Sequence, residues 1–155
     1  MLISKDPALS AAFRDYREFD QRRDTQNRFN FQMTDLQAAI GREQLRKLPV
    51  FLLRRESLFQ KYKAAGLDLL DIKSKGQKVT PVRYRAVLRT SKPHDINCAM
   101  QRHNISTIIP IQDWELLGPP EDFPNALDLC RNSVSLPLYP SLPDHNVKKI
   151  INVLK

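Results

Sequence analysis

The sequence predicts an α+β fold in which helices cover one side of a small sheet. Two helical segments come first, and short strands then alternate with helices to the end of the 155 residues. Strands that are so few and so short favour this layered class over a doubly wound sheet. The composition, 41% hydrophobic and 27% charged, is that of a globular domain with a hydrophobic core.

The composition along the chain also bears on where the protein works. No stretch reaches the roughly 18 consecutive apolar residues that a membrane span needs, so no membrane partner is expected. The beginning of the chain lacks the order of a secretory signal, because Lys5 and Asp6 follow only a few apolar positions. We therefore expect a cytoplasmic protein.

The first two helices are predicted from apolar spacing and from capping residues. Residues 6–23 carry apolar side chains at helical spacing, and Pro7 suits the first helical position. Residues 20–30 are polar and predict a loop. Thr34 and Gln37 form a capping box, in which each side chain accepts a hydrogen bond from the other residue's amide. A second helix is expected to start there.

Pro49 is expected to interrupt this second helix. It removes the amide that would bond the carbonyl of Leu45, which predicts a kink or a break. The helix then resumes over residues 50–65, with Gly66 as its stop. Its core-facing side chains are predicted to be Phe51, Leu52, Leu58, Phe59 and Tyr62, and its solvated face Arg54, Arg55, Lys61 and Lys63.

Three strands are predicted in the remainder of the chain. Residues 79–89 form the first, because apolar and polar side chains alternate from residue 82 to residue 86. Residues 105–110 predict the second strand. Residues 134–139 predict the third, which Pro137 confines to a sheet edge or a strand end.

Three helices are predicted around these strands. Pro93 opens the first, and Asn104 suits the left-handed position that closes it. A short helix is expected over residues 125–131. The last helix is expected to start at Ser141 with Asp144 as its capping partner. Its apolar face is Val147, Ile150, Ile151 and Leu154.

The net charge of +8 is concentrated in one stretch. Residues 72–93 carry seven basic and no acidic side chains, whereas residues 94–155 carry five basic and seven acidic ones. A solvated loop followed by the wet face of an edge strand is the simpler interpretation. A site for a polyanion or an anionic partner that uses Arg83 and Arg85 is the alternative. Nucleic acid is not an expected partner.

No complete catalytic or metal site follows from these patterns. Glycine-rich phosphate loops, the G-x-S-x-G elbow and the H-E-x-x-H helix are absent from the sequence. Cys98 and Cys130 have no cysteine or histidine at metal spacing, so neither a disulfide framework nor a zinc site is expected. Asp113 and Glu115 flank Trp114, but nothing else marks a catalytic partner, and Trp114 is more simply a core or interface anchor. No catalytic residue and no metal ligand are assigned.

Two segments carry a more specific signal. Residues 28–45 read RFNFQMTDLQAAIGREQL, and residues 133–140 read SVSLPLYP. The first resembles the segment x-Y-N-Y-R-M-T-D-I-Q-A-A-x-G-x-x-Q-L of the DegT/StrS-type nucleotide-sugar aminotransferases, which are pyridoxal-phosphate (PLP) enzymes of fold type I. The second resembles their LSLPLYP signature. Residues 1–14 are more weakly similar to the strand and helix that follow the family's cofactor lysine.

The resemblance implies the C-terminal portion of such an enzyme. Residues 1–30 then form a helix and an interface loop that continue from a large PLP-binding domain. Residues 31–155 form the small C-terminal domain of fold type I, a short antiparallel sheet covered by helices and preceded by a long kinked helix. The family's Schiff-base lysine lies upstream of the position matched by Met1, and Lys5 lacks its serine-rich and histidine-rich surroundings. The chain alone is therefore expected to bind no cofactor and to be inactive.

The same resemblance implies the activity and partners of the complete enzyme. It would bind PLP and move an amino group from glutamate or glutamine to a keto-sugar nucleotide. Its partner would be a second copy in a homodimer, or the missing PLP domain. The alternatives are a basic binding or assembly module and a non-functional remnant of the aminotransferase. A remnant would self-associate through exposed apolar side chains such as Phe51, Leu52 and Leu53.

The resemblance assigns one site residue, Asn30. The family's asparagine at this position contacts the cofactor phosphate of the other subunit, and a neutral amide can donate a hydrogen bond to a phosphate oxygen. Without the family, a loop-capping role is the simpler interpretation. Gln32 occupies a position where the family often has arginine, and residues 108–117 (IIPIQDWELL) lack the two histidines of the family's substrate-side stretch. These departures indicate a different amino acceptor, or relaxed constraint in a fragment.

Overall fold

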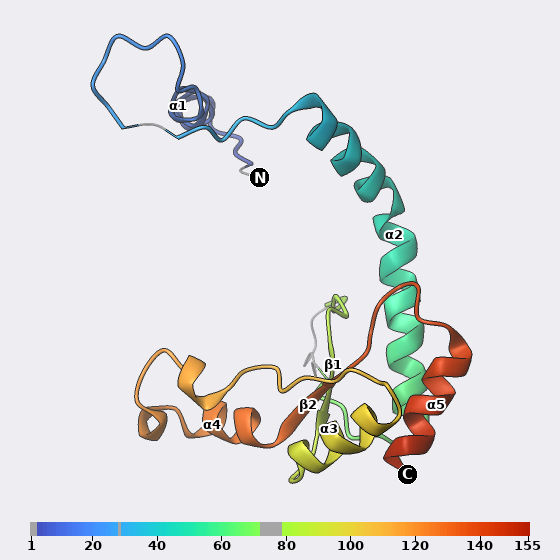
Figure 1. Ribbon diagram of the computed structural model, residues 1–155. Helices are drawn as coiled ribbons and strands as arrows, with labels where there is room; N and C mark the ends of the chain where they lie inside the picture. The colour runs from blue at the N-terminus through green and yellow to red at the C-terminus, as the bar shows by residue number, and fades with distance from the viewer. Residues whose placement is uncertain (1–2, 28, 72–78) are drawn as a thin grey trace. The chain divides into compact units, whose positions relative to one another are not determined.

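A computed structural model describes residues 3–27, 29–71 and 79–155, which belong to two compact units (Figure 1). The first unit comprises Met1–Arg46 and the second comprises Lys47–Lys155. The division of the domains after residue 30 stays a prediction about the complete fold. The α+β class is confirmed, because the described residues form helices around a short antiparallel sheet.

The first unit contains helix α1 (Pro7–Arg17) and the start of helix α2 (Asp35–Ala64). Asp6 caps α1, since its Oδ1 accepts a hydrogen bond of 2.8 Å from the amide of Ala8. The helix is shorter than the predicted 6–23, because the polar residues after Arg17 continue as irregular chain. None of residues 3–27 and 29–46 is buried.

The capping box at the start of α2 is confirmed. The amide of Thr34 donates to Oε1 of Gln37 at 3.0 Å, and the amide of Gln37 donates to Oγ1 of Thr34 at 3.3 Å. Of the kink or break predicted at Pro49, the structure excludes the break, since α2 continues through Pro49 as one long helix from Asp35 to Ala64. The proline frees the carbonyl of Leu45, but this part of the helix is exposed and water can bond that carbonyl.

The second half of α2 supplies one wall of the core of the second unit. Leu58, Phe59 and Tyr62 are buried, whereas Phe51 and Leu52 are only half-buried. The hydroxyl of Tyr62 donates a hydrogen bond of 2.9 Å to the carbonyl of Pro137. Gly66 follows the helix with a φ of 84°, the left-handed conformation that a terminal glycine adopts most readily.

In the described part of the chain, the sheet consists of two short antiparallel strands. Strand β1 (Ala86–Arg89) pairs with strand β2 (Ser133–Leu136), so that Ala86 faces Leu136 and Arg89 faces Ser133. Leu69 bridges Leu88 on the other side of β1, and Ile108 bridges Ser135 on the other side of β2. As far as the structure describes these flanking segments, each contributes one bridge and no strand.

The predicted strands were therefore too long. The alternation from residue 82 to residue 86 does not form a strand, because Arg83 turns into the protein and bonds carboxylates, as described below. Residues 105–110 make only the single bridge at Ile108, and Pro110 has no amide for a further one. Strand β2 ends directly before Pro137, which agrees with the prediction for that proline.

Helices and turns surround this sheet. Helix α3 (Pro93–Arg102) is followed by Asn104 with the predicted left-handed φ, here 58°. Two single-turn 3-10 helices, η1 (Asp113–Glu115) and η2 (Pro120–Asp122), precede helix α4 (Pro124–Arg131). Helix α5 (Asp144–Leu154) begins at Asp144 and not at Ser141, because Asp144 pairs with basic side chains of α2 instead of capping.

The core of the second unit lies between α2, the two strands, α3 and α5. The predicted apolar face of α5 is confirmed, with Val147 and Ile150 buried and Ile151 and Leu154 packed against the core. The core residues are Leu58, Phe59, Tyr62, Ala86, Leu88, Met100, Val134, Leu136, Leu138, Leu142, Val147 and Ile150. Among the described residues, no helix has the length and apolar character needed to cross a membrane.

Candidate functional site

Asn30, the predicted cofactor contact, lies on an exposed loop just ahead of α2. Its Oδ1 accepts a hydrogen bond of 3.1 Å from the amide of Gln32. Among the residues that the structure describes, none accepts a hydrogen bond from its Nδ2 amide. The side chain thus shapes its own loop with its oxygen and keeps its donor group available.

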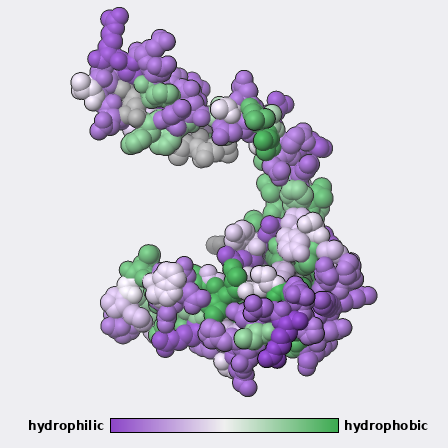
Figure 2. Space-filling model, in the orientation of Figure 1, coloured by the Kyte–Doolittle hydropathy of each residue, from purple (hydrophilic) through white to green (hydrophobic). Residues whose placement is uncertain are grey.

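Two aromatic residues, Phe29 and Phe31, flank Asn30 in this loop. The rings of Tyr16 and Phe31 stack with centroids 6.0 Å apart, and the ring of Phe29 lies 5.8 Å from that of Phe31. Tyr16 and Phe31 line an open hollow of about 750 Å³ between α1 and residues 31–33. The hollow is lined by Ile3, Ser4, Ser10, Phe13, Arg14, Tyr16, Arg17, Phe31 and Met33. Figure 2 shows apolar, green surface on this unit.

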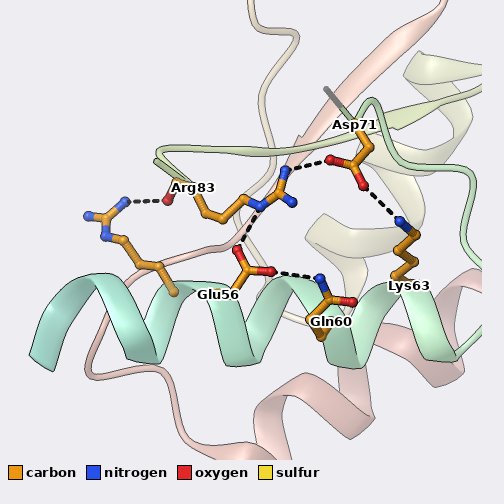
Figure 3. Close-up of polar contacts among 6 residues, drawn as sticks. Glu56, Gln60, Lys63, Asp71 and Arg83 are labelled. Carbon is orange, nitrogen blue, oxygen red and sulfur yellow. Dashed lines mark hydrogen bonds and ion pairs between the residues drawn. The ribbon is translucent and has the colours of Figure 1, made fainter. Parts of the chain in front are cut away.

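The second unit contains a network of charged side chains centred on Arg83 (Figure 3). Its Nε lies 2.8 Å from Oε2 of Glu56, and its Nη1 lies 2.7 Å from Oδ1 of Asp71. Asp71 also accepts from Lys63 at 2.7 Å, and Glu56 accepts from Gln60 at 2.6 Å. Only 9% of Arg83 is exposed, so its predicted place on a solvated strand face or at an anion site is wrong.

Three members of the network, Asp71, Glu56 and Arg83, have shifted pKa values. Hydrogen bonds from Lys63 and Arg83 lower the pKa of Asp71 to about 2. Burial alone would raise the pKa of Glu56, but hydrogen bonds from Gln60 and Arg83 outweigh it, and the pKa falls below its usual value. Burial acts to lower the pKa of Arg83, yet its two carboxylate partners raise it. All of these shifts favour the charged forms, which is the behaviour of a structural ion-pair network.

A second group of charges ties α5 to α2. Asp144 accepts from Lys61 and, at 2.7 Å, from Arg54, and these bonds lower the pKa of Asp144 to about 2. Arg54 also donates to the carbonyl of Leu142 at 2.6 Å. Arg54, Lys61 and Lys63, predicted as a solvated face, thus contact other parts of the second unit.

The remaining candidate groups do not assemble a site. Cys98 is exposed and Cys130 is buried, and both are free thiols. Trp114 is 78% exposed on η1, which excludes the core role considered for it. Within residues 3–27, 29–71 and 79–155, no group of three or more His, Cys, Asp or Glu side chains is placed to hold a metal ion. Asn30 is therefore the remaining candidate. Among the described residues, none accepts a hydrogen bond from its Nδ2 amide.

Sequence reasoning missed the partners of Arg83. Glu56 precedes it by 27 residues and Asp71 by 12, and neither spacing belongs to a local pattern that relates carboxylates to an arginine. A charged residue in the middle of an alternating apolar stretch was the one available signal, and it also fits an exposed edge strand.

The model of the DegT/DnrJ/EryC1/StrS aminotransferase family matches residues 1–155, the whole chain. The protein belongs to this family. The chain is similar to the spore coat polysaccharide biosynthesis protein SpsC of Bacillus subtilis, with 29% identity over 148 residues. It is also similar to the dTDP-4-dehydro-2,3,6-trideoxy-D-glucose 4-aminotransferase of Saccharopolyspora spinosa, with 29% identity over 124 residues.

This chain matches only part of each relative. The two matches cover 82% and 75% of this chain but only 37% of SpsC and 32% of the Saccharopolyspora spinosa enzyme. The chain thus spans about a third of the length of these relatives.

Solved structures confirm the fold. The crystal structure of S. venezuelae DesV in complex with a ketimine intermediate matches 98% of this chain with a TM-score of 0.80 at 22% identity. A DegT DnrJ EryC1 StrS aminotransferase from Brucella abortus matches 97% with a TM-score of 0.79 at 18% identity. This chain covers 44% of each of those structures. Its α+β arrangement is therefore that of a part of these aminotransferase structures.

Proposed function

We propose that this chain supplies the C-terminal part of a PLP-dependent aminotransferase that acts on a keto-sugar nucleotide, with glutamate or glutamine as amino donor. The observation that carries the proposal is the family match over residues 1–155 in a chain whose matches cover only 37% and 32% of two relatives. The substrate class is supported by the Saccharopolyspora spinosa relative, whose name specifies a dTDP-linked keto sugar. A cytoplasmic location is part of the same proposal.

The chain is proposed to be inactive by itself. PLP, when bound, supplies the electron sink for amino transfer and is held covalently through a lysine. Lys5 is the one lysine in the described part of the first unit, and it is exposed to solvent and not enclosed in a pocket. The cofactor lysine would come from the portion of the fold that this chain lacks.

Asn30 is proposed to contribute to the cofactor's phosphate site. The fit rests on its hydrogen bonding, because Oδ1 is already used by Gln32 while the Nδ2 amide remains a donor. A phosphate oxygen accepts hydrogen bonds of this kind. The Thr34 and Gln37 capping box fixes the chain directly after the loop, so Asn30 is held next to a well-defined helix start.

The first unit supports a macromolecular partner, either a large PLP-binding domain or a second copy in a homodimer. Residues 3–27 and 29–46 have no buried side chain, so this unit has no core of its own. A folded segment of this size needs apolar burial to offset its conformational entropy. Its exposed apolar side chains are Ile3, Leu9, Tyr16, Phe19, Phe29, Phe31, Met33, Leu36, Ile40 and Leu45.

A chimera tests the proposal. The N-terminal portion of the Saccharopolyspora spinosa aminotransferase that has no counterpart here is fused to this chain, and amino transfer to that enzyme's keto sugar and cofactor absorbance are measured. The chimera is expected to bind PLP stoichiometrically and to transfer the amino group. The isolated chain is expected to do neither, and stoichiometric cofactor absorbance on the isolated chain would overturn its proposed incompleteness.

Matched variants at position 30 separate a phosphate contact from a loop-shaping role. Asn30→Asp keeps the oxygen that accepts from Gln32 but replaces the amide donor with a carboxylate, which repels phosphate. It is expected to weaken PLP binding by the chimera more than tenfold, or about 1.4 kcal/mol. Asn27→Ala, in the same exposed loop, is the control. If Asn30→Asp binds PLP as well as the unmodified chimera does, Asn30 only shapes the loop.

A further inference from the structure

The second unit contains a hollow of about 400 Å³, a volume within the range of small-molecule sites. Three stretches that are far apart in the chain form its walls, namely residues 104–106, residues 137–142 and one face of α5. The lining residues are Asn104, Ile105, Ser106, Pro137, Tyr139, Leu142, Asn146, Lys149 and Ile150. The hollow is therefore a product of the tertiary fold, and it belongs wholly to this unit.

Two hydrogen bonds from α2 fix the wall formed by residues 137–142. The hydroxyl of Tyr62 donates to the carbonyl of Pro137 at 2.9 Å, and Nη2 of Arg54 donates to the carbonyl of Leu142 at 2.6 Å. Both donors come from the helix that also supplies one side of the core. This wall is thus held in place before a ligand arrives, which lowers the entropic cost of binding.

Lys149 is the one charged side chain among the described lining residues. Its Nζ donates to the carbonyl of His103 at 2.9 Å, and an ammonium group has two further donors. The chain on both sides of the hollow is free of carboxylates, since residues 99–107 and 145–155 contain no Asp or Glu. Asp144 already pairs with two basic side chains of α2. An anionic ligand in the hollow would therefore meet one positive charge and no carboxylate of the lining.

The other polar side chains of the hollow supply neutral donors. The amide groups of Asn104 and Asn146 and the hydroxyl of Ser106 make no hydrogen bond to another residue that the structure describes. Amide and hydroxyl groups donate to a carboxylate oxygen as readily as to water. These three groups are thus available to a ligand that Lys149 attracts.

The rest of the lining is apolar. Leu142 and Ile150 are each only 2% exposed and close the hollow toward the core. Ile105 and Pro137 are half-buried, and Tyr139 is 44% exposed, so these three residues keep apolar surface open to a ligand. Covering this surface with a hydrocarbon group would stabilise a complex through burial.

This combination fits a small carboxylic acid with an apolar body. One ammonium group balances a single negative charge, whereas a doubly charged ligand would bring more charge than the lining compensates. The described lining also contains no arginine, whose forked donors suit phosphate oxygens. We propose that this hollow binds a small monocarboxylate with an aromatic or branched apolar body, and that Lys149 bonds its carboxylate. The site does not include Asn30 and does not depend on the proposed amino transfer.

NMR titration of the isotope-labelled full chain with phenylacetate tests the proposal. Saturable shifts are expected at the backbone amides that line the hollow. Phenylethanol has the same ring without the charge and should bind about tenfold more weakly, because a charge-assisted hydrogen bond is lost. Acetate has the charge without the ring and should also bind more weakly. The absence of saturable shifts with phenylacetate, or equal binding of either comparison compound, would overturn the proposal.

Two adjacent lysines of α5 provide variants with the same change of net charge. Lys149→Gln should weaken phenylacetate binding about tenfold and leave phenylethanol binding unchanged, because only the carboxylate uses the ammonium group. Lys148→Gln should leave both affinities unchanged, since Lys148 is exposed and does not line the hollow. Equal weakening by both variants would replace the site with diffuse attraction and overturn the proposal.

A third variant keeps the test independent of folding. Lys149→Gln removes one exposed hydrogen bond, so it is expected to keep the thermal unfolding midpoint of the unmodified chain. If it unfolds, Ser106→Phe takes its place, because Ser106 is an exposed wall residue and a ring there should block the hollow. Ser91→Phe, at an exposed position outside the lining, is its control. Phenylacetate binding that Ser106→Phe does not weaken would place the ligand elsewhere and overturn the proposal.

A carboxylate beside an apolar group is also found at the C-terminus of a peptide. Acetylated glycyl-phenylalanine therefore serves as a second probe, since it presents the same ring and charge on a peptide. Phenylacetate is expected to bind at least as tightly as this peptide. Binding of the peptide more than about tenfold tighter would identify a protein C-terminus as the ligand and overturn the assignment to a small acid.

Discussion

Arg83 donates a 2.7 Å hydrogen bond from Nη1 to Oδ1 of Asp71 while its guanidinium group lies 3.8 Å from the ring centroid of Phe59. One side chain thus satisfies a carboxylate and covers an aromatic ring of the core. A cation over a ring face and a charge-assisted hydrogen bond both gain strength when water is excluded. Arg83 is therefore a structural residue of the second unit.

Replacing Arg83 with methionine tests this role. Arg83→Met keeps an unbranched apolar stem but leaves Glu56 and Asp71 without their shared partner. We expect the free energy of unfolding to fall by about 2 kcal/mol, less than for a fully buried pair because both carboxylates are partly exposed. Urea unfolding followed by circular dichroism measures the change. Arg89→Met, which removes only a 3.6 Å exposed pair, should cost less than about 0.5 kcal/mol. Equal losses would contradict the assignment.

Stability is expected to fall with acid because of Asp71. The pKa of Asp71 is lowered from 3.8 to about 2 in the folded chain, by Lys63 first and then by Arg83. Between these values the unfolded chain binds more protons, so stability rises with pH. This contribution is complete above about pH 5 and is lost as pH falls toward 2. The lowered pKa of Asp144 acts in the same direction and window.

The urea midpoint, measured at a series of pH values, checks this acid dependence. Asp71→Asn should flatten the profile between about pH 5 and pH 2, because no proton is then taken up at position 71 on unfolding. Glu121→Gln, a change at an exposed carboxylate of η2, is the control and should keep the slope. An unchanged slope in Asp71→Asn would show that the network does not control the acid response.

The two faces of α2 should respond differently to truncation. Leu58 is fully buried, so Leu58→Ala should cost about 2–4 kcal/mol through lost burial and the cavity it leaves. Leu53 is 73% exposed on the same helix, and Leu53→Ala should change the free energy of unfolding by less than about 0.5 kcal/mol. Both values come from urea titrations of the full chain. A cost at Leu53 as large as that at Leu58 would mean that Leu53 is covered in solution.

Alanine substitutions of two glycines should have opposite effects on stability. Gly41 lies inside α2, and Gly66 follows its end. Gly66→Ala should cost about 1 kcal/mol, because alanine is strained at a φ of 84°. Gly41→Ala should raise the helix content, since a methyl group there meets nothing within 4 Å and alanine favours a helix interior by about 1 kcal/mol. Thermal unfolding reports the first effect, and the circular dichroism signal at low temperature reports the second. A stabilised Gly66→Ala variant would argue against the left-handed stop.

Without a partner, the chain should self-associate as its concentration rises. Leu36 and Ile40 lie one helical turn apart on α2 and are both exposed, so they share one face. The double variant Leu36→Gln and Ile40→Gln should shift the association to higher concentration in sedimentation experiments, because it removes apolar surface. Glu43→Gln on the same helix serves as the control. A chain that remains monomeric at high concentration would contradict this prediction and the remnant hypothesis together.

Local chemistry made several elements predictable from the sequence. Helix ends depend on backbone groups close in sequence. The structure confirms the capping box of Thr34 and Gln37, the helix start at Pro93 and the helix stop at Gly66. The strands were less predictable, because their ends depend on partners more than 40 residues away, such as Ser133 for Arg89. Arg83 could not be placed for the same reason, since its partners come from α2 and from the chain that follows it.

The site was predictable only in part. Asn30 was found through a motif, and the structure adds that its oxygen is used locally while its amide is left to donate. The contacts of Arg55 with the carbonyls of Arg83 and Tyr84 could not be found, because Arg55 lies on a helix more than 25 residues before them and no periodicity relates these positions. Only the packing of α2 beside residues 83–85 brings these groups together.

The short edges of the sheet limit the ability of this chain to form fibres. Both β1 and β2 have neighbours on their two sides, because Leu69 bridges the outer side of β1 and Ile108 bridges that of β2. The outermost segments make single bridges and are too short to offer a long row of free amides and carbonyls to an incoming strand. Association of the native chain should therefore proceed through apolar side chains alone, with no added β-structure and no seeding of cross-β fibres.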